Sequence, residues 1–332
     1  MPRVLTTILL AAFFLYGAYW FIGKSTREQG LERWFDERAA AGWVADTEVE
    51  LKGFPNRYDA VMTDLNLADP ASGWAWSAPR FELMQLSYQP NHYIARWPQS
   101  QTVSSPDQKI NVISEDLRAS IIFEPRSDFI IDRATLTANT IDIQSTANWG
   151  AASEDLVLAL RQSTKGEAHY DLAVKTSSFR PSNALLLEID RARVMPESFQ
   201  LFELSAVAAF ADKLSRNSFN NNSADLTHVD LEGLNLEWGD LAFRAAGEFD
   251  VDAEGYPSGR ITVRAENWER ILDMAIAADV VNVNFGETLR SGLSLLARFS
   301  GNPDTLDVPL SFTNKETRLG PITLGPAPRL KL

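Results

Sequence analysis

The chain has 332 residues, of which 45% are hydrophobic, and its formal net charge at pH 7 is −13. This acidic balance argues against a nucleic-acid partner and against docking onto anionic lipid through a basic patch. The absence of cysteine excludes thiol catalysis, iron–sulfur clusters and cysteine zinc sites, so a large hydrophobic core must hold the fold together.

An uncharged apolar segment, residues 4–22, lies near the N-terminus. As a helix rising about 1.5 Å per residue it covers roughly 30 Å, the thickness of the hydrocarbon core of a bilayer. Aromatic residues gather at its C-terminal end, where an interfacial belt is expected. We predict a transmembrane helix whose membrane-span residues include Val4, Leu10, Phe13, Phe14, Tyr19, Trp20 and Ile22.

Three interpretations of this segment are open: an uncleaved anchor, a cleaved signal peptide, or a buried helix of a soluble fold. The anchor is favoured, because the apolar run is too long for a signal peptide and aromatic residues stand where a cleavage site needs small ones. Basic residues after the segment blur the positive-inside rule, yet acidic residues are mixed among them. We predict a single-pass protein of the inner membrane with its body in the periplasm.

Residues 25–41 continue with helical periodicity. Leu31, Trp34, Phe35 and Arg38 recur at the spacing of one helix face, so a stripe should face the body or the bilayer surface. Gly42 is a plausible C-terminal stop for this juxtamembrane helix.

From residue 43 to residue 178 the apolar pattern changes to a period of two, which is typical of half-buried strands. Alternating apolar residues in 156–160 and 170–174 flank a glycine-containing segment and predict a β-hairpin. Residues 196–216 show an apolar stripe at helical spacing after a proline, which predicts a helix. The polar segment 217–223 then reads as a loop and a soft boundary.

The second half repeats the strand pattern with greater regularity. The apolar phase moves by one residue at Gly233, which predicts a turn or bulge, and long alternating segments follow on both sides of a turn at 254–259. Helices are predicted over 268–279 and 287–299, and a last strand over 306–312. Three prolines in the final segment exclude a central strand there and leave an edge strand or an extended tail.

These elements predict a mainly β (α+β) fold: an N-terminal transmembrane helix, then a large curved antiparallel sheet with a few packing helices. The expected organisation is a membrane anchor over residues 1–24, a juxtamembrane helix over 25–42, a first β-rich part over 43–216, and a second β-rich part with two helices over 217–332, continuous with the first.

Three segments carry a resemblance to a known family. GFPNRYDAVMTDLNL (53–67), GWAWSAPRFELMQLSYQPNHYIARWP (73–98) and LDVPLSFTNKETRLGPITLGPAPRL (306–330) resemble the domain of unknown function 2125 family. Its members are bacterial, mainly alphaproteobacterial, proteins with one N-terminal membrane span, so the resemblance implies a Gram-negative envelope protein. It brings no activity and no catalytic residues. A looser similarity, of layout only, is to AsmA-like envelope proteins, a class associated with moving or organising lipids.

The sequence offers little to support catalysis. His92, His169 and His228 are scattered, and surface or structural roles are favoured for all three. An aspartate-rich turn at 250–255 resembles the opening of a calcium loop, but Ile261 stands where a bidentate glutamate is needed. No HExxH, GxSxG, Walker A or GxGxxG pattern occurs. We therefore expect no catalytic site, no metal site and no cofactor.

Trp74 and Trp76 belong to an aromatic-rich stretch that either lines an apolar groove or packs as an ordinary sheet, the second being favoured. The leading hypothesis is non-catalytic: an apolar sheet face binds or guides lipid or another apolar envelope component. The candidate groove residues are Trp74, Trp76, Leu236, Trp238, Phe243 and Phe249. The alternative is a structural scaffold of the inner membrane that acts through an envelope protein partner, and an enzyme comes third.

Overall fold

The computed structural model describes residues 2–125, 128–191, 193–220, 224–277, 281, 283–299 and 302–330. These residues form seventeen strands and five helices, so the predicted mainly β, antiparallel fold with an N-terminal apolar helix is confirmed. The chain divides into two compact units. Unit 1 holds residues 1–122 and 145–147, and unit 2 holds residues 123–144 and 148–332.

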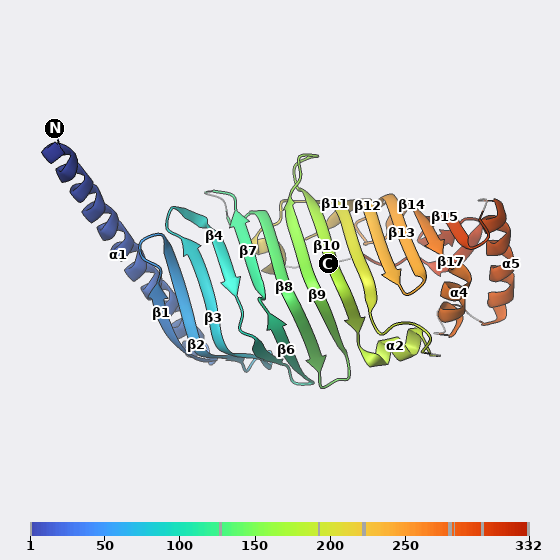
Figure 1. Ribbon diagram of the computed structural model, residues 1–332, viewed down its shortest axis with the longest axis horizontal. Helices are drawn as coiled ribbons and strands as arrows, with labels where there is room; N and C mark the ends of the chain where they lie inside the picture. The colour runs from blue at the N-terminus through green and yellow to red at the C-terminus, as the bar shows by residue number, and fades with distance from the viewer. Residues whose placement is uncertain are drawn as a thin grey trace. The chain divides into compact units, whose positions relative to one another are not determined.

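Unit 1 consists of one long helix and seven strands (Figure 1). The strands β1 to β3 pair in sequence order, and β3 then pairs with β4 along one part of its length and with β5 along another. The elements are α1 (Pro2–Ala40), β1 (Val44–Lys52), β2 (Arg57–Asp69), β3 (Trp74–Leu86), β4 (Gln89–Arg96), β5 (Ser100–Ser104), β6 (Lys109–Glu115) and β7 (Arg118–Phe123).

Helix α1 is one continuous element that has two different environments. Its N-terminal half is long and apolar enough to cross a membrane, and its side chains are largely exposed. Its C-terminal half covers the apolar face of β1–β3, where Trp20 is buried and Leu31 and Phe35 pack against the same cluster. Two residues of the predicted stripe, Leu31 and Phe35, therefore face the body, whereas Trp34 is exposed.

Unit 2 consists of ten strands, each paired antiparallel with the next along the chain, and four helices (Figure 1). The strands are β8 (Ile131–Ser145), β9 (Gly150–Gln162), β10 (His169–Pro181), β11 (Phe199–Phe210), β12 (Leu226–Trp238), β13 (Leu241–Val251), β14 (Pro257–Glu266), β15 (Thr305–Thr313), β16 (Glu316–Leu319) and β17 (Ile322–Pro326). The helices are α2 (Asn183–Ile189), α3 (Arg216–Asn220), α4 (Trp268–Ala277) and α5 (Val283–Phe299).

Several local predictions are confirmed in unit 2. The predicted hairpin is β9–β10, with Leu160 opposite Leu172. The phase change at Gly233 is a register shift in the β12–β13 ladder, between Leu231 and Leu234. The two predicted helices are α4 and α5, and the proline-containing end of the chain forms the short strands β16 and β17.

The predicted helix over residues 196–216 is wrong, because residues 199–210 form strand β11. This strand lies between β10 and β12 and pairs with both, so its backbone groups are satisfied by two neighbours. Residues 206–209 are buried on both faces of the sheet. In a stretch buried on both faces, apolar and polar residues do not alternate, so the strand is not visible as a period of two. The apolar residues happen to recur at helical spacing, but pairing with β10 and β12 makes the segment a strand.

The predicted loop over residues 217–223 is described only in part. Residues 216–220 form the short helix α3, and residues 221–223 lie outside the described residues. The soft boundary predicted there falls within unit 2, between the paired strands β11 and β12.

Candidate functional site

One face of the unit 2 sheet is apolar across eight strands. Directly opposed residues of antiparallel neighbours share a face, so the register defines this surface. We call it the apolar face. One of its rows runs Leu136, Leu158, Val174, Leu204, Leu234, Ala245, Val263 and Val308, and the next runs Ala134, Leu160, Leu172, Ala206, Leu231, Gly247, Ile261 and Leu310.

The opposite face of the same strands carries charged pairs. Lys175 lies 2.6 Å from Glu203 across β10 and β11, and Arg244 lies 2.8 Å from Glu266 across β13 and β14. Lys165, in the β9–β10 turn, adds an ion pair of 2.9 Å with Asp230 of β12. The sheet of unit 2 is therefore strongly amphipathic, with one face suited to water and the other to apolar contact.

Helices α4 and α5 cover one end of the apolar face. Trp268 and Leu272 of α4 and Leu293 of α5 form a buried cluster with residues of β14 and β15, and Phe243 of β13 packs against it. The indole of Trp268 donates a hydrogen bond of 2.9 Å to the Pro303 carbonyl, which fixes the start of α4. The covered part of the face is thus the β13–β15 end.

Beyond these helices, the middle of the apolar face on β9–β12 keeps partly exposed side chains. Leu158 is 38% exposed, and Leu172, Val174, Leu204 and Leu234 are each only partly buried. Full burial of a leucine or valine side chain is energetically favourable. The described helices leave these side chains partly exposed, so a ligand or partner that covered them would be stabilised by the additional burial. We take it as the candidate functional site.

Residues from loops contact the apolar face at both ends of the strands. The hydroxyl of the fully buried Tyr170 accepts a hydrogen bond of 2.9 Å from the backbone of Leu214. At the other strand ends, Trp238 stacks on Phe199 with ring centroids 4.6 Å apart and donates to the Pro196 carbonyl at 2.7 Å. The partly exposed surface is therefore a band across the strands.

The predicted groove residues fall into two sets. Leu236, Trp238, Phe243 and Phe249 all lie on the apolar face, in β12 and β13, but Trp238 is buried and Phe243 is covered by the helices. Phe249 contacts Phe312 edge to face, with centroids 5.8 Å apart.

The other two predicted groove residues belong to unit 1. The indole of Trp76 donates to Gln101 Oε1 at 2.8 Å and packs against the cluster beneath α1, whereas Trp74 is exposed at the start of β3. The residues that carry the uncovered band, Leu158, Leu172, Val174 and Leu204, were not predicted as groove residues. The alternation of Leu158, Leu172 and Val174 is visible in the sequence, whereas Leu204 lies in the segment that was predicted to be helical. Only the tertiary structure shows that, among the described residues, the buried cluster of α4 and α5 does not include these side chains.

In unit 1, helix α1 is fastened to two turns of the sheet. Tyr16 Oη donates to the Pro55 carbonyl at 3.0 Å, Tyr19 Oη to the Ser87 carbonyl at 2.9 Å, and Trp20 Nε1 to the Arg57 carbonyl at 2.9 Å. These contacts lie within the last turns of the predicted membrane span. The apolar helix and the body are thus joined through side-chain hydrogen bonds as well as through the chain.

Tyr58 of β2 forms the centre of this junction. Its ring stacks on Trp20 with centroids 5.6 Å apart, and the Arg27 guanidinium lies 3.9 Å from its centroid. Burial raises the pKa of the Tyr58 hydroxyl above its ordinary value, and the Arg27 charge opposes that rise in part. The residue therefore acts as a neutral aromatic packing element.

Comparison with protein-family models matches residues 20–328 to the family described as "Uncharacterized protein conserved in bacteria", domain of unknown function 2125. The chain belongs to the domain of unknown function 2125 family. The match covers the β-rich body and begins at Trp20, the residue where α1 enters the core of unit 1. No curated protein and no solved structure matches the chain. None of these comparisons bears on the AsmA-like layout, which stays a prediction.

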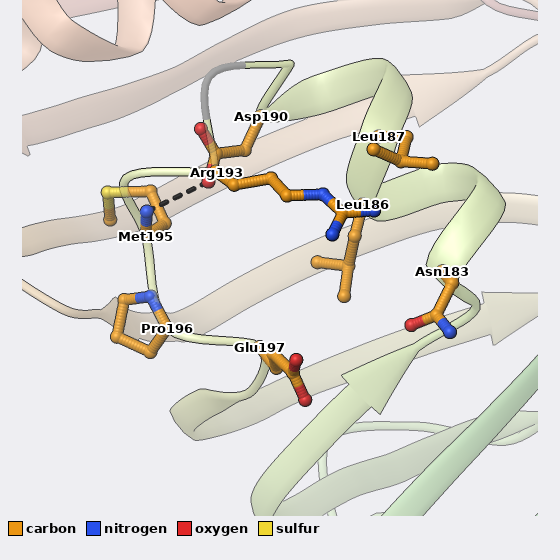
Figure 2. A pocket seen from close by; sticks show the side chains of 8 residues that line it. All are labelled: Asn183, Leu186, Leu187, Asp190, Arg193, Met195, Pro196 and Glu197. Atoms are coloured by element: carbon orange, nitrogen blue, oxygen red, sulfur yellow. Dashed lines mark hydrogen bonds between the residues drawn. The ribbon is translucent and has the colours of Figure 1, made fainter.

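This domain of unknown function 2125 member also has a pocket of about 270 Å³ beside α2 (Figure 2). Asp190 anchors one wall of the pocket by accepting a hydrogen bond of 2.8 Å from the Met195 backbone. Arg193 is an exposed cation at the rim, and Leu186 and Leu187 of α2 supply apolar lining (Figure 2). The described residues that line the pocket include no arrangement of nucleophile, base and orienting group.

The three histidines of this family member lie in separate local contacts. His92 bonds Ser120 at 2.8 Å, His169 bonds the Glu167 carbonyl at 2.7 Å, and His228 bonds Asp250 at 2.8 Å. Among the described residues, no group of three or more His, Asp or Glu side chains is placed to hold a metal ion. The aspartate-rich turn instead uses Asp252 Oδ1 to accept the backbone N–H groups of Glu254 and Tyr256.

Proposed function

We propose that this domain of unknown function 2125 member is a non-catalytic envelope protein that binds or guides acyl chains on the apolar face of unit 2. In this proposal α1 anchors the protein in the inner membrane and the body lies in the periplasm. The observation that carries it is the partly exposed band of Leu158, Leu172, Val174 and Leu204 beyond the cover of α4 and α5.

The chemistry of this band favours an acyl chain. The hydrophobic effect is non-directional, so an acyl chain needs apolar area and no hydrogen-bond partners. The rows that cross β9–β12 consist of aliphatic side chains, and the polar Thr176 nearby is buried and donates to the Glu154 carbonyl at 3.1 Å. Covering each partly exposed leucine contributes roughly 1 kcal/mol.

The proposal is tested by site-specific photocrosslinking of the full chain in bacterial membranes. We place p-benzoylphenylalanine at Leu158 or at Leu204, irradiate, and identify adducts by mass spectrometry. The matched control is Glu203, which neighbours Leu204 on β11 but points to the charged face and pairs with Lys175. We expect lipid adducts at 158 and 204 and none at 203.

A competing substitution sharpens the test. Leu158 and Leu204 lie in the same row, on either side of Val174, so Leu204→Asp should abolish the lipid adduct at position 158 in a protein whose circular dichroism is unchanged. Equal lipid labelling at 158 and 203, or no lipid adduct at any position, contradicts the proposal.

A second candidate function, a scaffold that binds a protein partner, is favoured by helix α2. Its described residues include no buried side chain, and it exposes Leu185 and Leu187 beside the exposed Val194. Exposed apolar side chains close together in the chain are typical of protein contact sites. In the same crosslinking experiment, a probe at Leu187 that captures one defined envelope protein, with no lipid adduct at 158 or 204, supports the scaffold.

A further inference from the structure

The place where α1 joins the body sets how deep the body sits in the membrane. Tyr16 of α1 bonds the body, and the side chains of the apolar residues 4–15 before it are all exposed. At about 1.5 Å per residue this part is about 18 Å long, well short of the roughly 30 Å hydrocarbon core. A bilayer that accommodates the whole apolar segment must therefore reach the level of Tyr16, Tyr19 and Trp20.

The turns that these side chains bind reach the same level. They are residues 53–57, which join β1 to β2 and include the first residue of β2, and residues 87–88, between β3 and β4. The two turns are joined to each other, since Ser87 N donates to the Asn56 carbonyl at 2.8 Å and Ser87 Oγ to the same carbonyl at 2.9 Å. The two turns therefore form one hydrogen-bonded platform beside the helix.

This platform exposes aromatic side chains beside the helix. Phe54 is 45% exposed, Tyr88 is 71% exposed, and Phe21 of α1 is 63% exposed. The rings of Phe54 and Phe21 lie with centroids 6.0 Å apart, and Phe54 also contacts Trp20 at 5.2 Å. The aromatic surface of the turns is thus continuous with the aromatic end of the apolar helix.

We propose that residues 53–57 and 87–88 form a membrane-docking surface that lies in the interface of the bilayer crossed by α1, with Phe54 and Tyr88 inserted among the lipids. Aromatic side chains prefer the interface, where the ring contacts acyl chains and the polar tip meets water. The lipid occupant follows from continuity, because the turns are hydrogen-bonded to the membrane segment itself. This surface belongs to unit 1, and it rests on the proposed anchoring by α1 but not on the proposed role of the apolar face of unit 2.

The absence of cysteine makes a direct test simple. Phe54→Cys and Tyr88→Cys variants of the full chain are each labelled with an environment-sensitive fluorophore and reconstituted into phosphatidylcholine nanodiscs. Phosphatidylcholine that carries a nitroxide near the headgroup serves as the quencher. We expect the lipid nitroxide to quench each label, because a group that lies in the interface is within reach of the headgroup region.

The matched control is Val44→Cys. Val44 is 54% exposed, and it lies at the opposite end of β1 from the turn, about 26 Å away at the rise of a strand. Its label should be quenched by aqueous iodide and not by the lipid nitroxide. Tyr88→Cys keeps the test decisive if Phe54→Cys, which loses ring contacts with Trp20 and Phe21, fails to fold.

Two outcomes overturn the proposal. Lipid quenching at positions 54 and 88 that is no greater than at position 44 shows that the turns lie in water. A blue-shifted label that neither quencher reaches shows that the turns are buried against protein, either a second copy or another chain. Failure to find lipid adducts at Leu158 and Leu204 would leave this result unaffected, because those residues belong to unit 2.

Discussion

At Gly23, helix α1 comes so close to the sheet that no side chain fits between them. A Cβ atom at this position would collide with the hydroxyl and ring of Tyr58. The ring has little freedom to move, because it is buried between Trp20 and the Arg27 guanidinium. A single small residue therefore sets the distance at which the helix packs against unit 1.

We expect Gly23→Ala to lower the free energy of unfolding by about 1–3 kcal/mol, the usual cost of inserting a carbon into a packed core. The matched control is Gly30→Ala in the same helix, where nothing lies within 4 Å of the added Cβ. That substitution should be neutral or slightly stabilising, because alanine favours helix more than glycine. Thermal unfolding of both full-length variants in the same detergent checks the prediction, and equal melting temperatures would refute it.

At the scale of elements, the long strands of unit 2 depend on close backbone approach at particular glycines. Gly247 in β13 has a φ of +144°, and a Cβ there would meet the Arg260 carbonyl oxygen and the Ile261 Cα of β14. Gly233 in β12 lies at the register shift and has nothing within 4 Å of an added Cβ. Gly247 therefore permits the close approach of β13 and β14, whereas Gly233 lies at a register shift where a side chain has room.

We expect Gly247→Ala to destabilise unit 2 by about 2–4 kcal/mol, since both backbone strain and a collision with main-chain atoms oppose it. Gly233→Ala should change stability by no more than about 0.5 kcal/mol. Hydrogen exchange of the β13 and β14 amides measures the difference. Loss of protection in both variants, or in neither, would show that the close approach at Gly247 is not what holds this pair of strands.

At the scale of the whole molecule, side chains that precede the predicted boundary after residue 24 contact the sheet of unit 1. Trp20 belongs to the core of unit 1, and Tyr16 and Tyr19 bond its turns. A chain that begins at residue 25 lacks all three side chains, while a chain that begins at residue 16 keeps them. The contacts between α1 and the sheet of unit 1 therefore include three residues that precede the predicted boundary.

We predict that the chain beginning at residue 25 loses roughly 3–5 kcal/mol of stability in unit 1, the scale of removing a buried tryptophan. The chain beginning at residue 16 should retain the stability of the full-length protein. Hydrogen exchange of the β2 and β3 amides in detergent compares the two. Equal protection in both truncated chains would mean that the Trp20 and tyrosine contacts contribute nothing to the fold.

Local patterns in the sequence determined the classes of element and many of their positions. A long uncharged run predicts a helix able to cross a membrane, and period-two alternation predicts half-buried strands, because both patterns reflect which faces a single element must bury. The register shift at Gly233 and the helices α4 and α5 were predictable for the same reason. Strand β11 was not, because a strand buried on both faces carries no such alternation.

Tertiary structure alone decided which surfaces are covered. The same alternation makes Phe243 and Val174 inward-facing, yet α4 and α5 cover Phe243 and leave Val174 partly exposed. Likewise, the apolar character of the α1 sequence does not change at Tyr16, although this is where the helix forms a hydrogen bond with the body. Burial depends on contacts between residues far apart in the chain, so the sequence by itself determined the elements and their apolar faces, and only the fold decided which of those faces remain open.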